Sequence, residues 1–169
     1  MVFLKAVLSV KKAIEAKDEK LFDKARQIAL LSHDKQIRYT LCADELPYYL
    51  GKGNLDAFYG DVEQYTAKFG ADWIWGIASD METDTDNPEF LEKALGYSEQ
   101  SLKMGKNYTK TYINARILYK LELNKEALAN ANEAMDLAKN ISNPDERTKD
   151  IKQSGELIEL IKKSPPAKN

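Results

Sequence analysis

Apolar residues recur every three or four positions along almost the whole chain, and this spacing is the strongest constraint on its fold. Two clear examples are Phe3, Val7, Val10 and Ile14, and then Leu55, Phe58, Val62, Tyr65 and Phe69. Such spacing puts apolar side chains on one face of an α-helix, whereas a half-buried strand alternates every second residue. No segment shows a convincing strand pattern, so the sequence predicts an all-α protein.

Turn and cap residues divide this pattern into about nine helices. Asp18 is a predicted N-cap, and Asn87-Pro88 and Asn143-Pro144 each combine a capping side chain with proline at the first helical position. Pro47 is expected to interrupt or end the third helix, because proline lacks an amide donor. The expected helices cover about 2–16, 19–31, 35–50, 55–69, 72–81, 88–104, 109–121, 125–140 and 144–163. The polar segment 164–169 is predicted to be a disordered tail.

Charge and length narrow the classes of partner. The chain has 169 residues, 25 basic and 27 acidic, which gives a formal net charge of −2. This near balance predicts no strong attraction to nucleic acid or to an anionic lipid surface. No apolar run approaches the roughly 20 residues of a membrane span, so no membrane insertion is expected. No signal peptide is recognisable, so the chain as written is expected to be cytoplasmic.

Residues with catalytic or metal-binding chemistry are sparse. Cys42 is the single cysteine, so no internal disulfide or Cys-x-x-Cys motif can form, and it is expected to be a small buried residue. Pairing with His33, nine positions away, would lack a third group and oxyanion donors. The acidic stretch from Asp80 begins like a calcium loop, but Thr85 and Leu91 replace the required glycine and glutamate. It is expected to be a solvated loop. We predict no catalytic residue, metal site or cofactor.

Small residues recur at regular positions in the helices expected in the C-terminal half of the chain. Ala94-Leu95 and Ala127-Leu128 are 33 residues apart, and Ala115 and Ala134 supply further small positions. This pattern resembles the tetratricopeptide repeat, although Thr111, Asn114 and Ala131 replace larger residues of that family. The resemblance implies antiparallel helical hairpins stacked as a right-handed solenoid. It implies one domain over 1–163, with the clearest repeat at 106–139, a partial repeat at 71–105 and a degenerate region at 1–70.

A second resemblance covers about 54–163. The segments Tyr65-Thr-Ala-Lys-Phe-Gly, Asp72-Trp-Ile-Trp-Gly-Ile-Ala and Phe90-Leu-Glu-Lys-Ala-Leu-Gly are similar to the helical C-terminal extension of some bacterial thioredoxin-fold proteins. This resemblance implies an accessory domain without its catalytic neighbour. The parent protein would then be periplasmic.

The repeat resemblance also implies a binding face. The first helix of each tetratricopeptide pair lines a concave groove, and the matching positions here are Tyr112, Arg116, Tyr119 and Lys120. Tyrosine offers a rigid apolar ring with a hydroxyl, and arginine offers a planar donor fork for carboxylates. These residues imply a non-catalytic scaffold that binds a protein or peptide, with Arg116→Glu weakening binding without unfolding.

Two alternatives stay open. The tyrosines of this face can instead pack against neighbouring helices. The chain can instead be an accessory or dimerisation domain of a larger thioredoxin-like thiol-disulfide oxidoreductase, forming a homodimer through an exposed apolar first or last helix.

Overall fold

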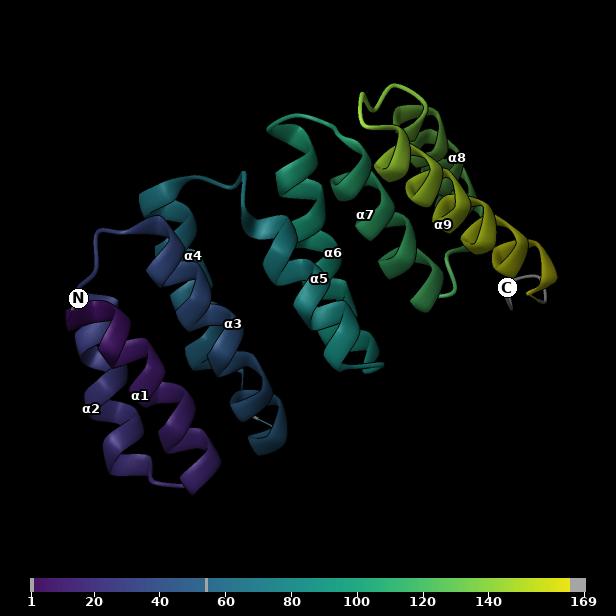
Figure 1. Ribbon diagram of the computed structural model, residues 1–169. Coiled ribbons are helices and arrows are strands. Elements are labelled where there is room, and N and C mark those ends of the chain that lie inside the picture. The colour runs from purple at the N-terminus through teal and green to yellow at the C-terminus, as the bar shows by residue number, and fades with distance from the viewer. Residues whose placement is uncertain (1, 54, 165–169) are drawn as a thin grey trace. The chain divides into compact units, whose positions relative to one another are not determined.

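The structure is a computed structural model that describes residues 2–53 and 55–164. These ranges contain nine helices and no strand, which confirms the all-α prediction (Figure 1). The helices are α1 (Val2–Ala16), α2 (Glu19–Leu30), α3 (Lys35–Lys52), α4 (Asp56–Phe69), α5 (Ile74–Asp84), α6 (Pro88–Lys103), α7 (Tyr108–Lys120), α8 (Asn124–Ala138) and α9 (Pro144–Lys163). They form two compact units, which we call unit 1 (Met1–Gly70) and unit 2 (Ala71–Asn169).

The predicted tail lies outside the described residues except for Ser164, whose extended backbone follows the end of α9. Within residues 2–53 and 55–164, no helix combines the length and apolar character needed to cross a membrane.

Side-chain caps set the start of several helices. Asp18, Asn87 and Asn143 each accept a hydrogen bond from a backbone N–H in the first turn of the helix that follows, as predicted. Asp34 does the same for α3, accepting from the N–H groups of the second and third residues of that helix. These bonds satisfy donors that have no partner within the helix, so short local motifs fix these boundaries.

The helix α3 continues past Pro47 to Lys52, so the expectation that this proline interrupts or ends the helix is wrong. Packing supplies the reason. The rings of Tyr48 and Tyr49, which follow the proline, lie 4.2 and 6.1 Å from the ring of Phe22 on α2, measured between centroids. These aromatic contacts offset the hydrogen bond that proline removes.

The helix α5 lies later in the sequence than predicted. The turn that precedes it is held by residues of α6 and α7. Ser101 Oγ on α6 donates to the Asp72 carbonyl at 3.1 Å, and Lys110 Nζ on α7 lies 2.6 Å from Asp72 Oδ1. At its other end α5 runs into the acidic stretch and ends at Asp84. The expectation of a solvated loop there is wrong for Glu82, which is 2% exposed.

Small side chains on α8 bring the last helices together. Ala127, Ala131, Ala134 and Ala138 are fully buried, at a spacing that places them on one side of the helix. The helix packs against both α7 and α9, and these two also touch each other (Figure 1). Because alanine allows close approach, α7 and α9 both pack closely on α8 and lie beside each other.

Candidate functional site

The four residues predicted as a binding face line a single groove in unit 2. Tyr112, Arg116, Tyr119 and Lys120 follow one another on α7 at intervals that keep them on the same face. They form one wall of an open groove with a volume of about 470 Å³. The groove is also lined by residues of α5 and α9, namely Glu82, Gln153, Glu156, Leu157 and Leu160. We call this the α7–α9 groove.

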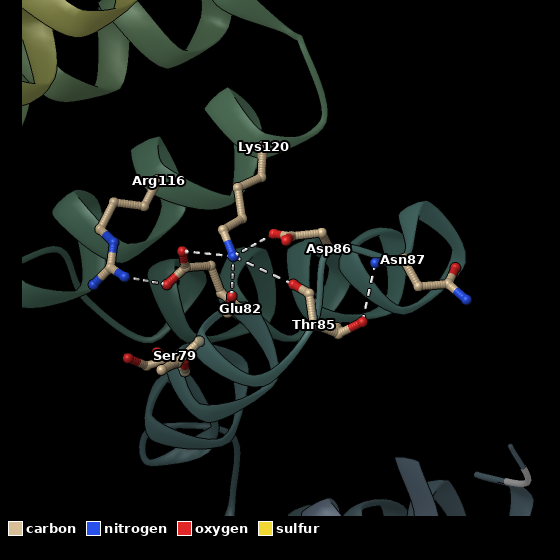
Figure 2. Close-up of polar contacts among 8 residues, drawn as sticks. Ser79, Glu82, Thr85, Asp86, Asn87, Arg116 and Lys120 are labelled. Carbon is tan, nitrogen blue, oxygen red and sulfur yellow. Dashed lines mark hydrogen bonds and ion pairs between the residues drawn. The ribbon is translucent and has the colours of Figure 1, made fainter. Parts of the chain in front are cut away.

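A buried carboxylate lies at one end of the groove. The Glu82 side chain is 3% exposed, and Arg116 Nη2 lies 2.6 Å from its Oε2 atom. Lys120 Nζ lies 3.6 Å from Oε1 of the same carboxylate. Figure 2 shows both cations reaching Glu82 from α7. A carboxylate removed from water is costly unless it is paired, so these contacts hold α5 against α7.

Lys120 also holds the end of α5. Its Nζ donates to the carbonyls of Glu82 and Thr85, at 2.6 and 3.3 Å, and lies 2.8 Å from Asp86 Oδ1 (Figure 2). The last carbonyls of a helix have no partner within it and carry partial negative charge. Lys120 is therefore a structural tie as well as a lining residue of the groove.

The two tyrosines are partly buried, so each ring packs against neighbouring side chains and also lines the groove. Tyr112 stacks on Tyr108 with centroids 5.5 Å apart, and the Arg116 guanidinium lies 6.0 Å from the Tyr112 centroid. Burial raises the pKa of Tyr112 above its ordinary value of 10. Tyr119 Oη lies 3.2 Å from Ser164 Oγ. The remaining surface of each ring faces the groove, in positions fixed by these contacts.

Sequence reasoning did not find the other wall. Leu157 and Leu160 come from α9, and Leu160 is 51% exposed. Glu82 was also missed, although the apolar residues Ile74, Ile77 and Met81 have a helical spacing that extends to position 82. The ion pair changes one expectation, because Arg116→Glu would place a second carboxylate against Glu82. That variant is expected to destabilise unit 2 as well as alter the groove.

Unit 1 contains a second buried ionic cluster. Arg26 Nε lies 3.0 Å from Glu45 Oε1, and Arg26 Nη2 donates to Asp61 Oδ2. Both carboxylates are almost fully buried, whereas the arginine side chain is 20% exposed. This cluster joins α2, α3 and α4. One cation therefore serves two carboxylates.

Burial shapes the titration of this region. Desolvation, reinforced by the nearby charge of Asp61, raises the pKa of Glu45 to about 9. Desolvation, followed by the charge of Glu45, raises the pKa of Cys42 to about 12. Cys42 is fully buried, as predicted, whereas His33 is exposed. A thiol in this state remains protonated at neutral pH, which is the opposite of what an activated nucleophile requires.

Across 2–53 and 55–164, no group of three or more His, Cys, Asp or Glu side chains is arranged to hold a metal ion. Comparison with protein-family models, curated proteins and solved structures finds no match to this chain.

Proposed function

We propose that this chain is a non-catalytic scaffold whose α7–α9 groove binds a peptide segment of another protein. The observation that supports this proposal is the joint placement of Tyr112, Arg116, Tyr119 and Lys120 along one open groove. Tyrosine and arginine are the residue types that most often dominate binding energy at protein interfaces. A volume of about 470 Å³ accommodates a few side chains of a bound segment.

The groove offers complementary contacts along its length. Leu157 and Leu160 supply an aliphatic wall, opposite the tyrosine rings of α7. A guanidinium has five N–H donors, and the Arg116 side chain is 36% exposed while one terminal nitrogen faces Glu82. Arg116 is therefore suited to bind a carbonyl or carboxylate oxygen of the segment. An apolar side chain of the segment would lie between the tyrosines and the leucines.

Preorganisation favours this site. The Arg116 and Lys120 side chains are held by Glu82, and Tyr112 is held between Tyr108 and Arg116. Side chains that are already ordered lose less conformational entropy when a ligand binds. The same contacts that stabilise unit 2 therefore present the groove in a binding-ready form.

Leu160→Asp tests this proposal. Leu160 is exposed, so the substitution places a charge in the groove without opening the core. Peptides are selected from a displayed random library on the wild-type chain, synthesised, and measured by fluorescence anisotropy. We expect Leu160→Asp to weaken them at least about tenfold, which corresponds to about 1.4 kcal/mol.

The matched control is Met104→Asp. Met104 is also an exposed apolar residue of unit 2, 60% exposed, but it does not line the groove. It is expected to leave the affinity within about threefold, because it lies outside the contact. Selected peptides that bind Leu160→Asp as tightly as the wild type would show that the groove is not the binding site.

A further inference from the structure

Exposed aliphatic side chains gather on the first two helices of unit 1. Val2, Leu4 and Leu8 of α1 are each more than half exposed, and Leu21 of α2 is 40% exposed. Leu31, the residue that follows α2, is 69% exposed. Scattered exposed leucines are normal, but Val2 and Leu21 border one groove, and exposed apolar residues that border a groove mark an interaction surface.

A groove runs between these helices. Its volume is about 330 Å³, and it is lined by Val2, Lys5, Ala6, Ser9, Leu21, Lys24, Ala25 and Ile28. Small residues leave a furrow, since Ala6 and Ala25 are buried and Ser9 is partly buried between the aliphatic side chains. Among the residues that the structure describes, the ionisable ones that line it are two lysines, and none is a carboxylate. We call this the α1–α2 groove.

We propose that the α1–α2 groove docks an acidic amphipathic helix of a partner protein. Aliphatic side chains on one face of that helix would fill the furrow over Ala6 and Ala25, a recurring mode of helix recognition. Carboxylates beside that apolar face would pair with Lys5 and Lys24, which are both exposed. This surface lies wholly in unit 1, and the proposal does not depend on the α7–α9 groove.

Charge decides against a second copy of the chain as the occupant. A symmetric dimer brings the same patch of both subunits together. Both copies of Lys5 and Lys24 would then lie in one interface, and like charges within an interface are unfavourable. The α1 helix has no acidic residue in its first turn to compensate. An acidic partner has the complementary charge.

The shape of the surface also decides against a lipid bilayer. A helix that lies on a membrane presents a continuous convex apolar face. Here the aliphatic residues border a furrow between two helices, and two lysines interrupt its edges. Such a furrow fits individual side chains of a helix rather than a flat layer of acyl chains.

Two synthetic peptides test the proposal. Each has about 18 residues with the same leucines at helical spacing, and the polar positions are glutamate in one and lysine in the other. Both are titrated into the full chain by fluorescence anisotropy. We expect the glutamate peptide to bind at least about tenfold tighter, with affinity that falls as salt rises from about 0.05 to about 0.5 M.

Charge reversal in the groove provides the decisive variant. The double substitution Lys5→Glu and Lys24→Glu is expected to reverse the preference, so that the lysine peptide binds at least about tenfold tighter. The matched control, Lys12→Glu with Lys20→Glu, makes the same charge change on exposed positions of the same helices outside the groove. It is expected to keep the original preference within about threefold. Leu21→Asp should weaken the glutamate peptide about tenfold with unchanged helicity by circular dichroism.

Several results would overturn this inference. Equal binding of the two peptides, or an unchanged preference in the Lys5 and Lys24 variant, would exclude charge-complementary docking. A concentration-dependent dimer mass in sedimentation that the glutamate peptide does not dissociate would assign the groove to a second copy. Binding to phosphatidylserine vesicles that the glutamate peptide does not compete would assign it to a membrane. Loss of the glutamate peptide in Leu160→Asp would move its site to unit 2, whereas unchanged binding supports unit 1.

Discussion

The buried ion-pair clusters of the two units combine cations and carboxylates in opposite proportions. Unit 1 places one arginine, Arg26, between two buried carboxylates, Glu45 and Asp61. Unit 2 places one buried carboxylate, Glu82, between an arginine and a lysine. The first cluster joins α2, α3 and α4, and the second joins α5 and α7. The difference predicts that the ratio of cations to carboxylates, rather than the presence of ion pairs, controls how such a cluster responds to pH.

The excess of carboxylate in the unit 1 cluster makes the free energy of unfolding fall as pH rises. The pKa of Glu45 in the folded state is raised to about 9, whereas its ordinary value is 4.5. Between these values the folded state holds a proton that the unfolded state has released, so the free energy of unfolding falls as pH rises. The stabilisation is fully present below about pH 4.5 and is lost as pH approaches about 9.

The largest expected effect comes from removing each arginine. Arg26→Met removes the cation that Glu45 and Asp61 share, and we expect unfolding of unit 1 to require about 3–5 kcal/mol less. Arg116→Met leaves Lys120 beside Glu82, so unit 2 should lose only about 1–3 kcal/mol. Urea unfolding followed by hydrogen exchange of core amides in each unit measures both. Equal losses in the two units would contradict the comparison.

The next effect separates the clusters by pH. Glu45→Gln carries a neutral side chain like the protonated acid, so it should match the wild type near pH 5 and exceed its stability near pH 8.5. The difference at the higher pH should reach at least about 1.4 kcal/mol, the value of one pKa unit. Thermal or urea unfolding at the two pH values measures this difference.

Glu82→Gln supplies the contrast in unit 2. This change leaves Arg116 and Lys120 without their shared buried carboxylate, and we expect a loss of about 1–3 kcal/mol at neutral pH. A gain in stability near pH 8.5 for Glu82→Gln, or no gain for Glu45→Gln, would show that the charge ratio does not control the pH response.

A smaller effect tests the tie between α7 and α5. Lys120→Met removes two hydrogen bonds to carbonyls at the end of α5 and the ion pair with Asp86. We expect a loss of about 1 kcal/mol, seen as faster hydrogen exchange of amides in the last turn of α5. Exchange in α9 should not change. Uniform acceleration throughout unit 2 would indicate global destabilisation instead.

The smallest expected effect tests whether burial or atomic separation sets the strength of an ion pair. Lys106 Nζ lies 2.6 Å from Glu133 Oε1, the same separation as between Arg116 and Glu82, but both side chains are at least 40% exposed. Lys106→Met should therefore change the free energy of unfolding by only about 0–1 kcal/mol in urea. A loss as large as that of Arg116→Met would show that separation alone sets the strength.

Most of the fold could be predicted because its signals are local. Asp18, Asn87 and Asn143 cap helices through bonds to residues two or three positions away, which the sequence displays directly. The continuation of α3 beyond Pro47 could not be predicted in this way. It depends on contacts with Phe22, which is distant in the sequence. Local rules located helix ends, and tertiary packing overrode one of them.

The candidate site also contains residues that local patterns predict and residues that only tertiary packing determines. The α7 wall follows from helical spacing and the family resemblance, which name residues on a single helix. The α9 wall depends on how α9 packs on the alanines of α8, and no local pattern gives that rotation. Glu82 required knowledge that two cations from α7 meet it. Residues contributed by one helix could be predicted, whereas their partners across the groove could not.

The burial of Cys42 makes its thiol a probe of local opening in unit 1. It is the single cysteine of the chain and has no exposed surface. A thiol reagent can modify it only when α3 separates from its neighbours, so the labelling rate reports the frequency of that opening. Unit 2 contributes no cysteine to the signal. The rate of thiol labelling therefore reports the opening of unit 1 alone, because unit 2 has no cysteine to react.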